Sequence, residues 1–227
     1  MVLTHLVLND MIKVKGCTHL LAKCLTDQDT NIQHLATQFF SEFASKSNNN
    51  IYNILPDTIG QLSADKSVDS ATFRRISRYL IQYVDKDWQF ESLISKICHR
   101  MGTTTLASQW HDYIYCLTLF RINEKTFKAL SSNFKSYKDA LANDRDAHTQ
   151  FISGIVSKCK KLAASKLEHE VTINEWISRI QALSSEVLVE SSKDKEEEDE
   201  VTTTTKSIVS KSSIVSQDEN TSSLNVM

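Results

Sequence analysis

Glycine and proline are scarce in this chain, and their scarcity limits the folds that it can adopt. The 227 residues include only 4 glycines and 1 proline, well below the average usage of these residues. A chain rich in strands needs many tight turns, which draw on glycine and proline for their backbone angles. Hydrophobic residues make up 41% of the sequence, enough to bury one sizeable core or a row of smaller ones. The composition therefore favours an all-α fold.

Apolar residues recur every three or four positions through most of the chain, as they do along one face of an α-helix. One such stripe runs through Phe73, Ile76, Leu80 and Val84, and polar breaks separate it from its neighbours. The pattern predicts helices at about 2–14, 17–25, 29–46, 51–62, 70–85, 88–101, 105–120, 124–133, 145–165 and 170–190.

The expected helices pair into hairpins that begin near residues 17, 51, 88 and 124, a repeat of roughly 34–37 residues. This period is typical of helical-hairpin solenoids, in which each hairpin buries its apolar face against its neighbours. Pro56 falls inside one expected helix, where proline normally kinks or ends the helix. The stretch 51–84 resembles a HEAT repeat, in which a proline kink in the first helix is part of the fold. We expect a HEAT-type α-solenoid of stacked antiparallel hairpins over residues 1–190.

Residues at the polar breaks indicate where individual helices start and stop. Ser70 and Asp87 each precede an apolar stripe, as helix-starting residues do. Gly16 and Gly102 stand where helices are expected to end, because glycine is the preferred residue just after a helix.

The two ends of the chain differ from the body. Residues 1–190 carry 22 Lys and Arg against 20 Asp and Glu, whereas residues 191–227 carry 4 against 8 and are rich in Ser and Thr. A segment with so few large apolar groups does not offset its ordering entropy, so 191–227 is expected to be a disordered acidic tail. The helix at 2–14 is apolar from its first residues, which indicates the second helix of a hairpin whose partner is missing. We therefore expect a fragment of a longer array, with exposed groups among Leu3, Leu6, Val7 and Ile12.

Patterns that carry enzymatic or metal chemistry are not found in the sequence. It has no glycine-rich phosphate loop, no nucleophile elbow and no His-Glu-x-x-His spacing, so we expect neither an enzyme nor a cofactor or metal site. The five cysteines form no Cys-x-x-Cys pair, which favours reduced thiols in an intracellular protein. No apolar run approaches the ~20 residues of a membrane span.

Several sequence blocks resemble one family. Residues 1–16 (MVLTHLVLNDMIKVKG), 50–57 (NIYNILPD) and 86–93 (KDWQFESL), with Leu35-Ala36 and Phe39-Phe40 between them, are similar to the C-terminal HEAT region of the first non-SMC subunit of condensin. The resemblance covers about residues 1–165. It departs from the family in a short loop after Leu62, in Trp88 and Phe90 where polar residues are usual, and in a tail without Ser/Thr-Pro sites.

The resemblance implies a non-catalytic scaffold subunit that acts in mitotic chromosome condensation. Its implied partners are two SMC ATPases, a kleisin and a second HEAT subunit, with the nucleus and chromosomes as its location and the cytoplasm possible in interphase. Repeat architecture alone also allows a HEAT- or armadillo-type transport adaptor that binds cargo peptides. The blocks at 1–16 and 50–57 favour condensin, because repeat architecture does not require them.

Two basic clusters are candidate sites for DNA or an acidic partner. Arg74, Arg75 and Arg78 project opposite the Phe73 stripe at 100° per residue, so they are either a phosphate-binding surface or an ordinary solvated face. Lys158, Lys160 and Lys161 are expected on the polar side of another helix, where a role in solubility is the alternative.

Three serines are considered as kinase substrates. Ser77 follows two arginines in a basophilic pattern but projects toward the core, which argues against its modification. Ser191 and Ser216 lie in the acidic tail with acidic residues after them, and their phosphorylation is expected to regulate partner contact without changing the fold.

Overall fold

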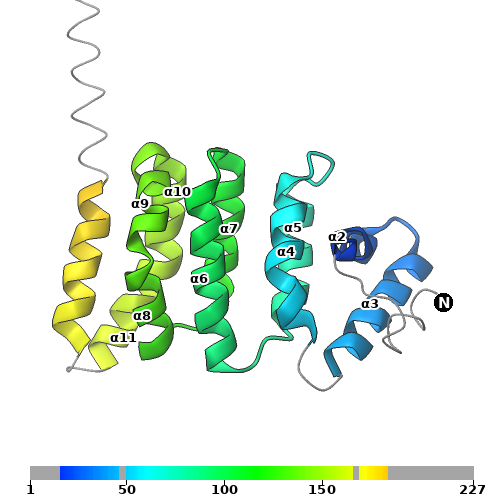
Figure 1. Ribbon diagram of the computed structural model, residues 1–227, viewed down its shortest axis with the longest axis horizontal. Helices are drawn as coiled ribbons and strands as arrows, with labels where there is room; N and C mark the ends of the chain where they lie inside the picture. Colours follow the sequence, from blue (N-terminus) through cyan, green and yellow to red (C-terminus); the bar gives the residue numbers. More distant parts are fainter. Residues whose placement is uncertain (1–15, 46–49, 166–168, 184–227) are drawn as a thin grey trace, which may run out of the picture. The chain divides into compact units, whose positions relative to one another are not determined.

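The computed structural model describes residues 16–45, 50–165 and 169–183, and within these ranges the regular structure is helical throughout. The all-α prediction is therefore confirmed (Figure 1). The helices are α2 (Thr18–Lys23), a 3₁₀ turn (Cys24–Thr26), α3 (Thr30–Ser45), α4 (Asn50–Ala64), α5 (Ser70–Ile81), α6 (Asp87–Thr103), α7 (Ala107–Leu119), α8 (Glu124–Ser132), α9 (Phe134–Asn143), α10 (Arg145–Phe151), a π-helical segment (Ile152–Val156), α11 (Ser157–Ser165) and a last helix at 170–183.

Helical hairpins stack in sequence order and form two layers. The first helices α4, α6 and the α8–α9 pair lie side by side, and we call them the first-helix layer. The second helices α5, α7 and α10 also contact one another in order and form the second-helix layer (Figure 1). Successive first helices begin at Asn50, Asp87 and Glu124, 37 residues apart. The solenoid predicted from the repeat spacing is thus the observed architecture.

A continuous apolar core fills the space between the two layers. Aromatic rings join the two helices of a hairpin across this core: Phe90 of α6 meets Phe120 at the end of α7 with ring centroids 5.5 Å apart, and Tyr137 of α9 stacks on Phe151 of α10 at 5.3 Å. The last helix is fixed to this core by two polar contacts, Trp176 Nε1 to Tyr137 Oη at 3.0 Å and His148 Nε2 to the Ile180 carbonyl at 2.9 Å. Because buried polar groups need partners, these bonds define the register of the final helix.

Close approach between α7 and the helix after α10 depends on Gly154. A Cβ atom at this position would overlap the side chain of Thr118 on α7. Gly154 lies within the π-helical segment Ile152–Val156, and such segments insert a wider turn into an α-helix. The helix expected at 145–165 is therefore present, but it consists of α10, a π turn and α11 in sequence.

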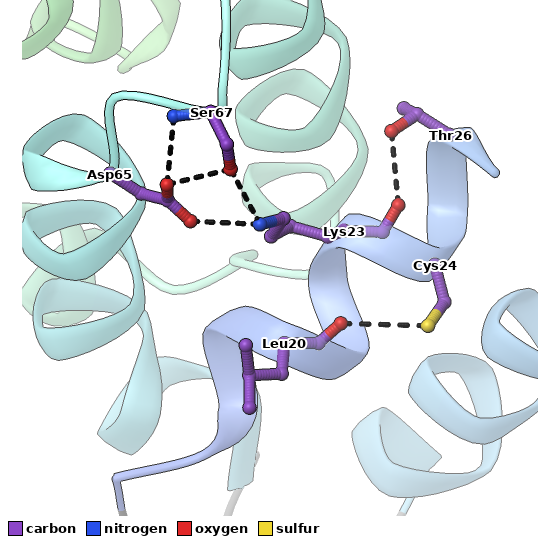
Figure 2. A network of polar contacts seen from close by, with 6 residues as sticks. All are labelled: Leu20, Lys23, Cys24, Thr26, Asp65 and Ser67. Carbon is purple, nitrogen blue, oxygen red and sulfur yellow. Dashed lines mark hydrogen bonds and ion pairs between the residues drawn. The ribbon is translucent and has the colours of Figure 1, made fainter.

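At the other end, a polar network anchors α2 to the turn between α4 and α5 (Figure 2). Lys23 Nζ donates to Asp65 Oδ2 and to Ser67 Oγ, each at 2.8 Å, and Ser67 Oγ donates to Asp65 Oδ1 at 2.7 Å. These bonds from Lys23 and Ser67 hold the pKa of the Asp65 carboxyl well below its usual range, as hydrogen bonds to a charged carboxylate do.

Three local expectations need correction. The N-cap of α5 is Asp69 rather than Ser70, because the Asp69 carboxylate accepts the Thr72 N–H at 2.7 Å and Ser70 is already helical. Gly102 does not follow a helix but lies within α6, where a Cβ would stand 2.8 Å from the Ser136 carbonyl oxygen of α9. The apolar pattern did not predict a helix at 134–144, but α9 occupies Phe134–Asn143.

Other expectations have mixed outcomes. Helix α4 continues through Pro56, which lies inside it. Cys98, Cys116 and Cys159 are buried and free, whereas Cys17 is exposed. Burial raises the pKa of Cys98 and of Cys159 to about 12.

None of the helices in the described ranges is long and apolar enough to cross a membrane. The predicted amino-terminal edge (Leu3, Leu6, Val7 and Ile12) and the tail 191–227 lie outside the described residues.

Candidate functional site

The candidate site is the outer face of α5, a strongly amphipathic helix in the second-helix layer. Its capping residue, Asp69, accepts the Thr72 N–H and fixes where the helix begins, and such a cap satisfies an otherwise unpaired donor. Phe73, Ile76 and Leu80 are all buried to about 1% exposure or less. The helical period then turns Arg74, Arg75 and Arg78 to the opposite side, where the structure shows all three exposed.

A shallow groove of about 810 Å³ follows this face of α5. The three arginines line it together with Ser70 and Tyr79 of the same helix and Tyr115 of α7. We call the surface formed by Arg74, Arg75 and Arg78 the arginine surface.

Tyr115 connects the arginine surface to the next hairpin. The Arg74 guanidinium lies over the Tyr115 ring, 5.2 Å from its centroid, within the range of a cation–π contact. The Tyr115 hydroxyl also donates to the Arg74 carbonyl at 3.4 Å. These two contacts hold Arg74 at a defined place on the groove wall.

Nearby, Asp112 of α7 is a partly buried carboxyl whose pKa is affected by the charge of Arg74. Burial raises the pKa of Asp112 to about 6, while a hydrogen bond from Ser63 and the charges of Arg74 and His111 act in the opposite direction. The Ser63 Oγ to Asp112 Oδ2 distance is 2.8 Å.

The charge of the arginine surface is not cancelled by ion pairs in the described part of the chain. Arg100 pairs with Asp57 at 2.6 Å and Lys23 with Asp65 at 2.8 Å, but no described carboxylate lies within ion-pair distance of the three arginines. Three guanidinium groups that share one face, without bound carboxylates, form a surface suited to phosphate oxygens, because each guanidinium presents several N–H donors.

The lysine cluster does not act as one surface. Lys158 is half-buried, and its Nζ donates to the carbonyls of Thr118 and Phe120, the latter at 3.0 Å. It therefore satisfies carbonyls at the end of α7, and its expected place on the polar side of the helix was wrong. Lys158 directly precedes the fully buried Cys159 on α11, and its long side chain can reach along the packed face. Lys160 and Lys161 are exposed as expected.

The serines considered as kinase substrates have different outcomes. Ser77 is fully buried, as its helical projection predicted. Ser191 and Ser216 lie outside the described residues, so their proposed modification stays a prediction.

Sequence reasoning missed Tyr79, Tyr115 and Asp112 as neighbours of the arginines. Tyr79 was detectable, since it follows Arg75 by four residues and so lies on the same face of the helix. Tyr115 and Asp112 belong to the next hairpin, and their approach depends on how α5 and α7 pack.

Comparisons with known proteins agree with this architecture. Residues 1–118 match the family described as Cnd1, non-SMC mitotic condensation complex subunit 1. The chain is 40% identical over 181 residues to Condensin-1 complex subunit CAP-D2 of Arabidopsis thaliana, covering 78% of this chain. It is 38% identical to Condensin complex subunit 1 of Xenopus laevis and 36% identical to that of Homo sapiens, over 79% and 80% of this chain.

The chain spans only 13% of the length of each of these three relatives. No solved structure matches it. The family match covers more than half of the residues, and the identities extend over most of the region that the structure describes. The chain therefore belongs to the family of non-SMC subunit 1 of the mitotic condensation complex.

Proposed function

We propose that this chain is a segment of a non-catalytic scaffold subunit of condensin that acts in mitotic chromosome condensation. Support comes from the family match and from the stacked hairpins, because solenoids act mainly through extended binding surfaces. ATP hydrolysis is assigned to the SMC partners. The family match favours this function over the transport-adaptor alternative.

The proposed partners are two SMC ATPases, a kleisin and a second HEAT subunit, with the nucleus and mitotic chromosomes as the site of action. The test is purification of the tagged parent protein from mitotic cells, followed by mass spectrometry. Recovery of SMC and kleisin proteins in near-equal amounts supports the proposal. Recovery of transport receptors and their cargo, without SMC proteins, contradicts it and supports the adaptor.

Within this scaffold, the arginine surface is proposed to bind the DNA backbone. One observation carries this step: three exposed guanidinium groups share a groove and have no carboxylate partner in the described part of the chain. We assign the contacts to phosphates. Contacts to the DNA backbone position a protein on the duplex but do not read its base sequence. Binding is therefore expected to be independent of DNA sequence.

Duplexes of equal length and unrelated sequence test this assignment by fluorescence anisotropy at low ionic strength. The variant Arg74→Gln/Arg75→Gln/Arg78→Gln is expected to lose roughly ten-fold or more in affinity, equally for every duplex. The matched control is Lys125→Gln/Lys128→Gln/Lys135→Gln, which removes three exposed charges from the first-helix layer and should change affinity by less than about two-fold. Equal losses in both variants would show that net charge alone drives binding.

A further inference from the structure

Ser70 lies on the same helical ridge as two of the three arginines. Residues 70, 74 and 78 are four apart, so Ser70, Arg74 and Arg78 form one row along α5. All three line the same groove. A group attached to the Ser70 hydroxyl would therefore lie directly beside the arginine surface.

The Ser70 hydroxyl is also accessible. Ser70 is exposed at the junction between the 65–69 turn and α5, and its side chain makes no hydrogen bond within the described residues. Ser67, in the same turn, is engaged with Lys23 and Asp65 (Figure 2), and Ser77 is fully buried. Among these three serines, Ser70 presents an unoccupied, exposed hydroxyl to a modifying enzyme.

We propose that Ser70 is a phosphorylation site whose phosphate occupies the arginine surface and blocks its contact with DNA. This inference rests on the proposed DNA-binding function. A protein kinase transfers the terminal phosphoryl group of ATP to Ser70 Oγ. The new P–O bond forms as the bond to the ADP oxygen breaks, and the hydroxyl proton leaves to solvent.

The charges support such a switch. A phosphoserine carries about −1.5 to −2 charges at neutral pH, against three positive charges on the arginine surface. Arg74, one turn further along α5, lines the same groove as Ser70, and a guanidinium can make a two-pronged contact with a phosphate. The phosphate would also lie in the first turn of α5, where the helix dipole favours negative charge. The neighbouring Asp69 carboxylate opposes the phosphate, which makes the Arg74 contact decisive for holding it.

The test uses the full chain with phosphoserine incorporated quantitatively at position 70. The control carries phosphoserine at Ser132, an exposed residue at the end of α8 in the first-helix layer. Phosphoserine at 70 is expected to weaken duplex binding by roughly ten-fold, as the triple arginine variant does. Phosphoserine at 132 should weaken it by less than about two-fold.

A phosphorus NMR titration tests the contact without DNA. The second pKa of the phosphate at position 70 should rise when Arg74 is replaced by glutamine, because the nearby guanidinium favours the dianion. A phosphate pKa at position 70 that Arg74→Gln leaves unchanged overturns the inference.

The two proposals fail in distinguishable ways. If the arginine variant weakens DNA binding and phosphoserine at 70 does not, the switch is wrong and the DNA-binding function stands. If neither change affects DNA binding, both are wrong.

Discussion

Asp112, the partly buried carboxyl beside Arg74, gives the clearest pH prediction at the scale of single residues. Its pKa is raised by burial to about 6 in the folded chain, above its ordinary value of 3.8. The folded state therefore binds its proton more tightly than the unfolded state. The resulting stability is fully present below about pH 4 and is lost as the pH rises through 6.

Replacement by asparagine should remove this loss of stability, because the side chain then carries no charge. The amide oxygen can still accept the hydrogen bond from Ser63. We expect Asp112→Asn to be more stable than the wild type at pH 8 by about 1 kcal/mol, a value reduced for the solvent screening of a partly exposed group. The advantage should vanish near pH 4. Urea unfolding at both pH values measures it, and an equal difference at pH 4 and pH 8 would show that charge is not the cause.

The exposure of a side chain was predictable where it depended only on the position of the residue around its own helix. The buried stripe of Phe73, Ile76 and Leu80 leaves the arginines only the opposite face, and that reasoning also placed Ser77 inside. It failed for Lys158, whose long side chain carries its ammonium group along the packed face to the end of α7, as lysine side chains can. Tyr115 was not accessible to such reasoning, since its contact with Arg74 joins residues 41 apart.

At the scale of helices, most boundaries follow from apolar spacing, but α9 was missed. The apolar pattern predicted helices at 124–133 and 145–165 and none between them. In the structure Asn133 ends α8, with its side-chain amide donating to the Ala129 carbonyl at 2.7 Å, and α9 begins at the next residue. Buried Phe134, Tyr137 and Leu141 carry a helical spacing that the sequence already contained. A break between the two helices is therefore present, but it consists of Asn133 alone and is much shorter than a loop.

Gly102 tests the packing of α6 against α9. Alanine normally stabilises a helix interior relative to glycine by roughly 0.5–1 kcal/mol. At position 102 its Cβ would meet the Ser136 carbonyl oxygen at 2.8 Å, and a backbone atom in a packed layer cannot move aside cheaply. We expect Gly102→Ala to lower the free energy of unfolding by about 1–2 kcal/mol.

Gly60→Ala is the matched control, because the nearest atom there belongs to the Arg100 side chain. That side chain can rotate away at the expense of its partly exposed ion pair with Asp57, so the change should stay within about 0.5 kcal/mol. Thermal or urea unfolding of both variants decides the matter. A Gly102→Ala chain as stable as Gly60→Ala would mean that α6 and α9 lie further apart than described.

At the scale of the whole chain, the order of the stack was predictable because the repeat spacing of roughly 34–37 residues matches the 37-residue interval between α4, α6 and α8. What the spacing did not provide is which side chains of neighbouring hairpins meet. The groove beside α5 depends on Tyr115 of the next hairpin, so its wall is a product of stacking. The arginines themselves could be selected from the sequence, whereas the surface they form with α7 could not.

The salt dependence of DNA binding tests the central claim most directly, because it counts the phosphate contacts that the arginine surface makes. Each phosphate neutralised on duplex DNA contributes about 0.9 to the slope of log affinity against log salt concentration. Removing Arg74, Arg75 and Arg78 by substitution with glutamine should therefore reduce the magnitude of the slope by up to about 3. The lysine control triple should leave the wild-type slope in place. A slope unchanged by the arginine substitutions, in a variant folded normally by circular dichroism, would contradict the account.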